Sequence, residues 1–295
     1  MITVIGNRIA IHYLPANHLN APHMETMTRN PKKAFRKLGS CSRTLFYLLN
    51  REFENPMITE ERAADPLAGG ILQKGYQCGM LWGASLAAGA EAHRRCEDLN
   101  EAMGVAILAT RRIMISFAQR EHTINCREIT RCDFSSKWSF AKYVLSGRFL
   151  HCFELAEQWT PEAIEAAIEG LSSERGKLPD HTVSCASEVA KRMGASDEER
   201  VMVAGFAGGL GLTGGGCGAL AAAIWMRSLE WCREHPNGSA MKNPRTKELL
   251  KSFETITDNR ILCSEVSGQR FGNLQDHTDF IHKGGCGSII EALAR

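Results

Sequence analysis

The chain has no Cys-x-x-Cys pair anywhere in its 295 residues, although it contains 11 cysteines. This absence argues against a thioredoxin-type dithiol, a zinc ribbon and the clustered cysteine run of a bacterial ferredoxin. A Cys-x-x-Cys-His sequence is missing too, which excludes covalent attachment of a c-type haem. Noncovalent haem on some of the 10 histidines stays open. Any shared site must therefore be built from cysteines that lie far apart along the chain.

Net charge is almost absent as well, because 35 basic residues face 33 acidic ones and leave a charge of only +2. This charge is too small to indicate a basic surface that binds nucleic acid, and we expect no nucleic-acid partner. The N-terminus also lacks the cationic and then long apolar layout of a secretory signal, because Gly6-Asn7-Arg8 interrupts it. We therefore expect a cytoplasmic protein.

One long uncharged stretch, residues 201–226, exceeds the roughly 20 residues needed to span a bilayer. Glycines are concentrated between Gly205 and Gly218, which lowers both hydrophobicity and helix propensity. We therefore expect a packed loop followed by a buried helix, and no membrane association.

Residues 209–214 also fit the glycine spacing of a dinucleotide-binding loop, with Glu230 as its acid. The residues before this loop favour a helix where that motif needs a strand, so we do not favour this interpretation.

An internal duplication organises the rest of the sequence. Residues 69–81 and 208–220 share an initial Gly-Gly pair, a glycine three residues before a cysteine, and the sequence Cys-Gly-x-Leu. Cysteines upstream and downstream continue the match in the same order and at similar intervals. The first series is Cys41, Cys78, Cys126 and Cys152, and the second is Cys185, Cys217, Cys263 and Cys286. Cys96, Cys132 and Cys232 fall outside it and are interpreted as buried or spare thiols.

The sequence predicts a mainly α protein of two tandem helical-bundle halves related by duplication, with a short N-terminal β-hairpin over 2–5 and 9–13. Helices are expected over 80–95 and 218–233, and Ser196 with Glu199 forms a capping box. Thr160-Pro161 is expected to begin another helix. The predicted divisions are 1–35 (hairpin and extended segment), 36–159 (first half), 160–180 (helix and linker) and 181–295 (second half).

The chemistry of the repeated cysteines depends on their place at helix starts. Cys78 and Cys217 each follow a glycine-rich turn at the expected first turn of a helix, where backbone N–H groups favour a thiolate. Four thiolates are the ligand set of two-iron and four-iron clusters. His151, His277 and His282 lie near the last cysteine of each series and could replace a thiolate or donate to cluster sulfur, although surface or supporting roles are favoured.

The two halves resemble the redox-active family named for its cysteine pattern C_GCAxxG_C_C, which also occurs as the non-haem domain of split-Soret cytochrome c. The resemblance covers about 39–157 and 183–294. It implies a helical fold, a redox role and an iron-sulfur cluster, 2Fe-2S or 4Fe-4S. The implied ligands are the family's ordered cysteines, which fall here on Cys41, Cys78, Cys126, Cys152, Cys185, Cys217, Cys263 and Cys286.

Three functions follow from these residues. The leading one is a redox or electron-transfer protein that binds iron-sulfur clusters and works with a redox partner protein or a small redox substrate. The second is a metal-free thiol-disulfide oxidoreductase in which Cys78 or Cys217 is the nucleophile. The third is a structural zinc protein. The sequence leaves open whether the protein is an enzyme and whether it forms a homodimer.

Overall fold

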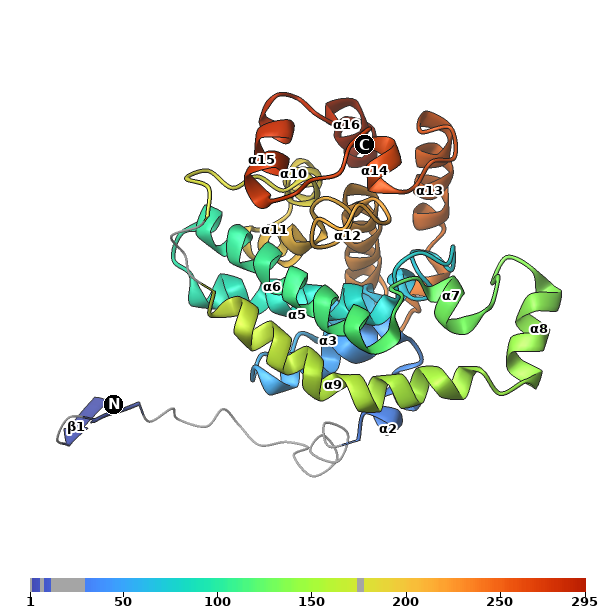
Figure 1. The fold of residues 1–295 in the computed structure, drawn as a ribbon, viewed down its shortest axis with the longest axis horizontal. Coiled ribbons are helices and arrows are strands. Elements are labelled where there is room, and N and C mark those ends of the chain that lie inside the picture. The colour runs from blue at the N-terminus through green and yellow to red at the C-terminus, as the bar shows by residue number, and fades with distance from the viewer. Residues whose placement is uncertain (1, 6–7, 12–29, 174–177) are drawn as a thin grey trace.

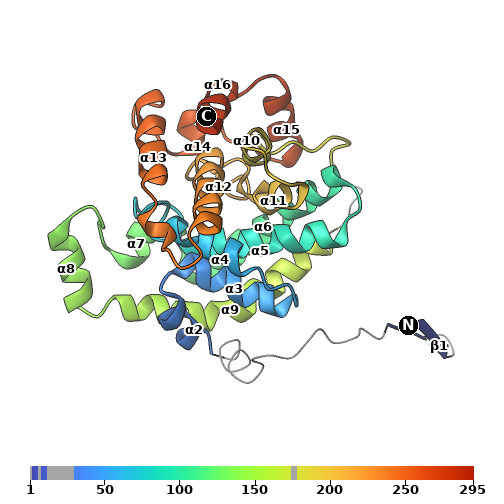
Figure 2. The same cartoon turned by 180° about the vertical axis from the view of Figure 1, so that it is seen from behind.

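The computed structural model describes residues 2–5, 8–11, 30–173 and 178–295, and most of these residues are in α-helices (Figures 1 and 2). The predicted mainly α class is confirmed. Helices of residues 31–171 occupy the lower part of Figure 1, and helices of residues 185–294 lie above them. The two halves of the sequence therefore also form two neighbouring groups of helices in space.

Two short strands, β1 (Ile2–Ile5) and β2 (Arg8–Ile11), pair antiparallel with Ile2 opposite Ile11. The Gly6-Asn7 turn expected between them and the extended segment 12–29 lie outside the described residues. The predicted N-terminal hairpin therefore stays a prediction.

Polar caps set the starts of the main helices in the first half. Ser40 Oγ accepts a hydrogen bond from the N–H of Arg43, and the carboxylate of Asp98 accepts one from Glu101. The elements in order are α2 (Pro31–Leu38), α3 (Cys41–Glu52), α4 (Ile58–Ala63), the 3₁₀ turn η1 (Asp65–Leu67), α5 (Gly79–Arg95), α6 (Leu99–Glu121), α7 (Cys126–Thr130), α8 (Lys137–Leu145) and α9 (Phe149–Leu171).

The second half repeats this order from α3 onward. Its elements are α10 (Cys185–Arg192), α11 (Asp197–Met202), η3 (Ala204–Phe206), α12 (Gly218–Glu234), η4 (Ala240–Lys242), α13 (Pro244–Ile256), α14 (Cys263–Val266), α15 (Leu274–His282) and α16 (Gly287–Ala294). Ser184 caps α10 as Ser40 caps α3. Apart from the added η4, each element from α3 to α9 has one counterpart in sequence order, which is what duplication predicts.

The two halves share one hydrophobic core. Helix α11 packs against α5, and α4 packs against α12, so each half contributes elements to the other. Trp82 of α5 meets Phe206 of η3 edge to face, with ring centroids 4.8 Å apart, and both side chains are fully buried. A Cβ added at Gly89 would lie 2.5 Å from Cα of Met202, so only glycine lets α5 approach α11 this closely. Neither half buries its apolar surface alone.

Several local predictions are confirmed. Helices α5 and α12 lie where the alanine-rich segments predicted them, and Ser196 and Glu199 form both bonds of a capping box at the start of α11. The uncharged stretch 201–226 is the end of α11, the turn η3, a loop and the first half of α12. In the described parts of the chain, no helix is long and apolar enough to cross a membrane.

The helix start predicted at Thr160-Pro161 is wrong, because both residues lie inside α9. Thr160 Oγ1 donates to the carbonyl of Ala156 in the preceding turn instead of capping. Trp159 contacts Phe117 edge to face at 4.7 Å, and α9 packs along α6. A proline inside a helix costs about 3 kcal/mol, so this packing must outweigh that cost. The division predicted between 159 and 160 therefore falls within one helix.

Candidate functional site

The first four repeated cysteines line one cavity of about 250 Å³. They come from four separate elements: Cys41 from the start of α3, Cys78 from the N-cap of α5, Cys126 from the start of α7, and Cys152 from the first turn of α9. A water needs roughly 10–15 Å³ by the same measure, so the cavity has room for a group of many atoms. Folding thus gathers thiols that the sequence keeps far apart.

All eight repeated cysteines lie at helix starts. In the second half, Cys185 and Cys263 are the first residues of α10 and α14, while Cys217 and Cys286 are the N-caps of α12 and α16. Free N–H groups and the helix dipole make such positions favourable for negative charge, and the short α7 and α14 add only their N–H groups. Each cavity therefore receives helix N-termini that suit anionic sulfur.

A left-handed turn precedes the central cysteine of each half. Residues 69–73 and 208–212 all have positive φ, including Ile71, a β-branched residue for which this conformation is strained. The turn brings a backbone N–H to the first cysteine, because Gly69 bonds the sulfur of Cys41 and Gly208 bonds that of Cys185. The strained backbone is thus used at the site, in both halves.

The second and third cysteines of each half are held together by a short backbone bridge. Gln77 pairs with Asn125 antiparallel, so that Cys78 N–H donates to Ile124 and Cys126 N–H donates to Tyr76 at 2.8 and 2.7 Å. Gly216 and Leu262 form the same bridge in the second half. This pairing connects segments that the sequence analysis did not join.

The thiols of the first cavity differ in acidity. A hydrogen bond from Cys78 lowers the pKa of Cys41 despite burial, and the N–H of Gly69 adds to the effect. The same contact with Cys41, together with burial, raises the pKa of Cys78 well above its ordinary value. Burial raises the pKa of Cys126, and it raises the pKa of Cys152 to about 11. The raised pKa of Cys78 thus goes against the expectation of a ready thiolate there, and within this pair the lowered pKa is that of Cys41.

Aromatic side chains close the first cavity around the sulfur atoms. The hydroxyl of Tyr143 lies 3.6 Å from Sγ of Cys152, within hydrogen-bond range for sulfur. Phe35, Phe134, Phe149 and Phe153 complete this part of the wall. Tyr143 belongs to α8, which has no buried residue and stands away from the body of the protein in both views (Figures 1 and 2). The sequence analysis missed Tyr143, since nothing in its local pattern points to sulfur.

The second cavity is lined by Cys185, Cys217, Cys263 and Cys286, but its volume is only about 10 Å³. The difference arises at α15, the counterpart of α8. His277, Phe280 and Ile281 of α15 line this cavity, joined by Phe271 just before the helix. Leu274 and His277 are buried, so α15 packs more closely onto its site than α8, which has no buried residue, does onto the first. The second cavity thus has space for about one atom-sized group, far less than the first.

Burial dominates the electrostatics of the second cavity. It raises the pKa of Cys185 well above its ordinary value, that of Cys217 to about 11 and that of Cys263 to about 12. The expectation of a ready thiolate at Cys217 is therefore wrong, because desolvation outweighs the helix start. Burial also lowers the pKa of His277 to about 4, so its imidazole is neutral.

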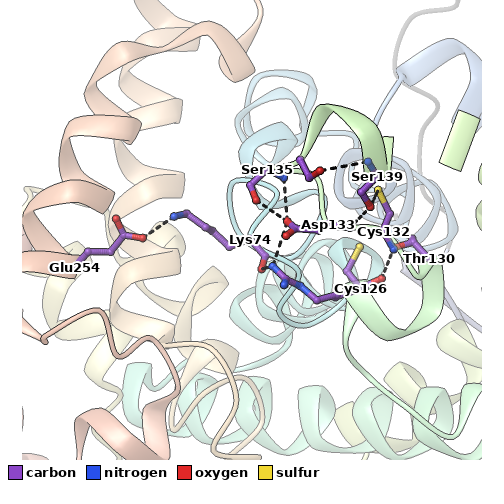
Figure 3. Close-up of polar contacts among 10 residues, drawn as sticks. Lys74, Cys126, Thr130, Cys132, Asp133, Ser135, Ser139 and Glu254 are labelled. Atoms are coloured by element: carbon purple, nitrogen blue, oxygen red, sulfur yellow. Dashed lines mark hydrogen bonds and ion pairs between the residues drawn. The ribbon is translucent and has the colours of Figure 1, made fainter. Parts of the chain in front are cut away.

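The remaining candidates lie outside both cavity walls or at their edges. Cys96 and Cys232 are buried in the shared core. Ser139 donates to Sγ of Cys132 at 3.7 Å beside the Asp133 turn, as Figure 3 shows. The same view shows the ion pair at 2.6 Å between Lys74 of the first half and Glu254 of the second. His151 is exposed and bonds Glu121, and His282 is exposed at the end of α15.

As arranged, no three histidine, cysteine, aspartate or glutamate side chains within residues 30–173 and 178–295 are close enough to hold a single metal ion. In the first half the four cysteines line a cavity that is much larger than a single ion. The residues there fit a multi-atom centre ligated by thiolates, because donor type, number and space all agree.

Sequence comparison agrees with the geometry. A family model described as "Putative redox-active protein (C_GCAxxG_C_C)" matches residues 40–163 and again 182–295. The chain therefore belongs to this family and contains two tandem copies of its pattern. Neither a curated protein nor a solved structure matches the chain significantly.

Proposed function

We propose that the protein transfers electrons through an iron-sulfur cluster in the first cavity, ligated by Cys41, Cys78, Cys126 and Cys152. One observation carries this proposal: four thiols from four helix starts line a single cavity of about 250 Å³. When bound, such a cluster accepts and releases one electron at a time. The family's redox character agrees with this role.

The surrounding residues have defined tasks in this proposal. The four thiols give up their protons and hold the cluster, while the helix N-termini offset its negative charge. The Gly69 N–H and the Tyr143 hydroxyl reach the sulfur atoms of Cys41 and Cys152, which tunes the potential. Aromatic side chains limit the access of water. A redox partner protein or a small redox substrate must exchange the electron, and the relation to split-Soret cytochrome c stays a prediction.

Anaerobic purification or reconstitution tests the proposal. The full chain should be coloured and contain iron and acid-labile sulfide, and replacing Cys126 with Ser should remove both. The matched control is Cys232→Ser, which changes a buried cysteine away from both cavities. A colourless protein that takes up no iron and sulfide would overturn the proposal.

A specific contact favours a second candidate, a metal-free dithiol. Cys41 and Cys78 are hydrogen bonded through their side chains, and Cys41 has the lowered pKa that a nucleophile needs. Oxidation would join the two sulfur atoms and pass two electrons and two protons to an oxidised disulfide substrate. Peptide mapping after mild oxidation of the metal-free chain tests this function. A Cys41–Cys78 disulfide that forms reversibly supports it, and its absence excludes it.

A further inference from the structure

His277 is buried in the second cavity without a hydrogen-bond partner for one of its ring nitrogens. Its side chain is only 1% exposed, and Nδ1 has no partner with hydrogen-bond geometry. A buried polar atom left unpaired costs about 1–3 kcal/mol. Such atoms in native proteins often mark the place of an ion or another ligand. His277 therefore calls for an explanation beyond packing.

The surroundings of His277 indicate what that ligand is. The cavity wall contains four cysteines, Ser267, His277 and apolar side chains. Thiolate sulfur and neutral imidazole nitrogen are the donors that Zn²⁺ and Fe²⁺ take in tetrahedral sites. Phe271 packs edge to face against the ring with centroids 4.9 Å apart, which holds the ring in place.

Cavity size decides between a cluster and an ion. The second cavity, of about 10 Å³, is no larger than the space one water needs. The first cavity is about 250 Å³ and has no histidine in its wall. The two halves thus offer different sites, one for a many-atom centre with sulfur ligands and one for a single ion with mixed ligands.

We propose that the second cavity binds one divalent metal ion of the Zn²⁺ or Fe²⁺ type through Nδ1 of His277 and three of its four cysteines. Each coordinating thiol releases its proton to solvent when the ion binds, and the neutral imidazole releases none. The sulfur atoms are not yet close enough to enclose an ion. Changes of χ1 rotamer move cysteine sulfur without moving the backbone, so the ion can draw the ligands inward.

Co²⁺ is the probe for this site, because it replaces Zn²⁺ and is paramagnetic and coloured. The first site is removed by changing Cys41 and Cys126 to Ser in the full chain. One equivalent of Co²⁺ should then give thiolate charge-transfer bands and tetrahedral d–d bands. Pulsed EPR should show nitrogen coupling that changes when histidine is labelled with ¹⁵N. This measurement needs no change at His277, so it stays decisive even if His277 variants fail to fold.

Variants of α15 then assign the nitrogen. His277→Gln should abolish the nitrogen coupling and weaken Co²⁺ binding at least about tenfold. The matched control is His282→Gln, at an exposed histidine of the same helix, which should change neither. Absence of nitrogen coupling in the chain with His277 intact would overturn the proposal. Undiminished Co²⁺ binding in two or more of the single variants Cys185→Ser, Cys217→Ser, Cys263→Ser and Cys286→Ser would overturn it too, because the site needs three of these four thiols. The iron and sulfide content of the unmodified protein tests the cluster proposed for the first cavity. The single ion proposed for the second cavity is tested by Co²⁺ binding, so each proposal can fail without the other.

Discussion

The side-chain Oε1 of Gln77 accepts a hydrogen bond of 2.8 Å from the backbone N–H of Gly216, across the interface between the two halves. Its Nε2 donates to the carbonyl of Gly209 at 2.9 Å, and the side chain is fully buried. Gln77 precedes Cys78, and Gly216 precedes Cys217. One side chain therefore fixes the turn that carries the central cysteine of each cavity.

We expect Gln77→Ala to lower the free energy of unfolding by about 1–3 kcal/mol, because it leaves the buried N–H of Gly216 without a partner. The Gly209 carbonyl keeps its hydrogen bond from the Thr213 hydroxyl. Urea denaturation followed by circular dichroism measures this loss. Gln275→Ala removes an exposed glutamine side chain of α15 and should change the value by less than about 0.5 kcal/mol. A loss of similar size in both variants would refute the assigned role of Gln77.

The same contact predicts coupling between Gln77 and Gly215. A Cβ added at Gly215 would lie 1.8 Å from Nε2 of Gln77, so Gly215→Ala must displace that side chain. In the double variant with Gln77→Ala the clash is relieved. The double variant should therefore be more stable than the sum of the two single losses implies, by about 1–3 kcal/mol in a double-mutant cycle. Simple additivity would show that the two residues do not meet.

Gly79 lies directly against the first cysteine of its half. A Cβ added there would be 2.5 Å from Sγ of Cys41 and 2.9 Å from Cα of Ala68. Gly79→Ala should therefore push the Cys41 sulfur away and reduce iron and sulfide content after reconstitution severalfold. Gly287→Ala is the control, because a Cβ at that position meets nothing within 4 Å. Equal metal content in both variants would argue against ligation by Cys41.

Tyr143 should raise the potential of the proposed cluster through its contact with Cys152. A hydrogen bond to a charged group contributes about 1.5–3 kcal/mol, and for a one-electron couple 1.4 kcal/mol corresponds to about 59 mV. Tyr143→Phe should thus lower the potential by on the order of 60 mV in a spectroscopic redox titration. Tyr47→Phe is the comparison, since the buried Tyr47 lines neither cavity. An unchanged potential in Tyr143→Phe would rule out this contact with sulfur.

The sequence was informative where local signals and the internal repeat agreed. Ser196 and Glu199 form the predicted capping box, and α5 and α12 begin within a residue of the predicted helices. The two matching series suggested that each half gathers its four thiols, and each set of four lines one cavity. Neither cysteine series contains a recognisable local motif. The fact that the series occurs twice was therefore the evidence that its cysteines belong together.

The properties that the sequence did not reveal depend on long-range packing. The pKa of Cys78 is raised by its contact with the Cys41 thiol and by burial, and the pKa of Cys217 is raised by burial. Both effects outweigh the helix start, and neither is visible in a local sequence pattern. Helices α8 and α15 occupy the same place between the third and fourth cysteines, yet only α15 buries side chains. Trp138 and Leu145 of α8 are 87% and 88% exposed, although composition alone would place them inside.

Thiol reactivity offers a test of the acidity order in the first cavity. In the reduced, metal-free chain, the lowered pKa of Cys41 means that it holds more thiolate at a given pH than its neighbours. Cys41 should therefore be alkylated before Cys78, Cys126 and Cys152 at neutral pH. Iodoacetamide labelling with peptide mass spectrometry over a range of pH values measures the order.

The cause of that order is testable with one further variant. Cys78→Ala removes the thiol that donates to Cys41, so burial is left to dominate and the pKa of Cys41 should rise. Its alkylation rate should then fall at neutral pH, about tenfold for each unit by which the pKa rises, and the pH profile should move upward. Cys132→Ala changes a cysteine that does not line the cavity and should leave the profile in place. If Cys41 reacts equally fast in both variants, its acidity does not come from Cys78, and the hydrogen bond between the two thiols has no role in it.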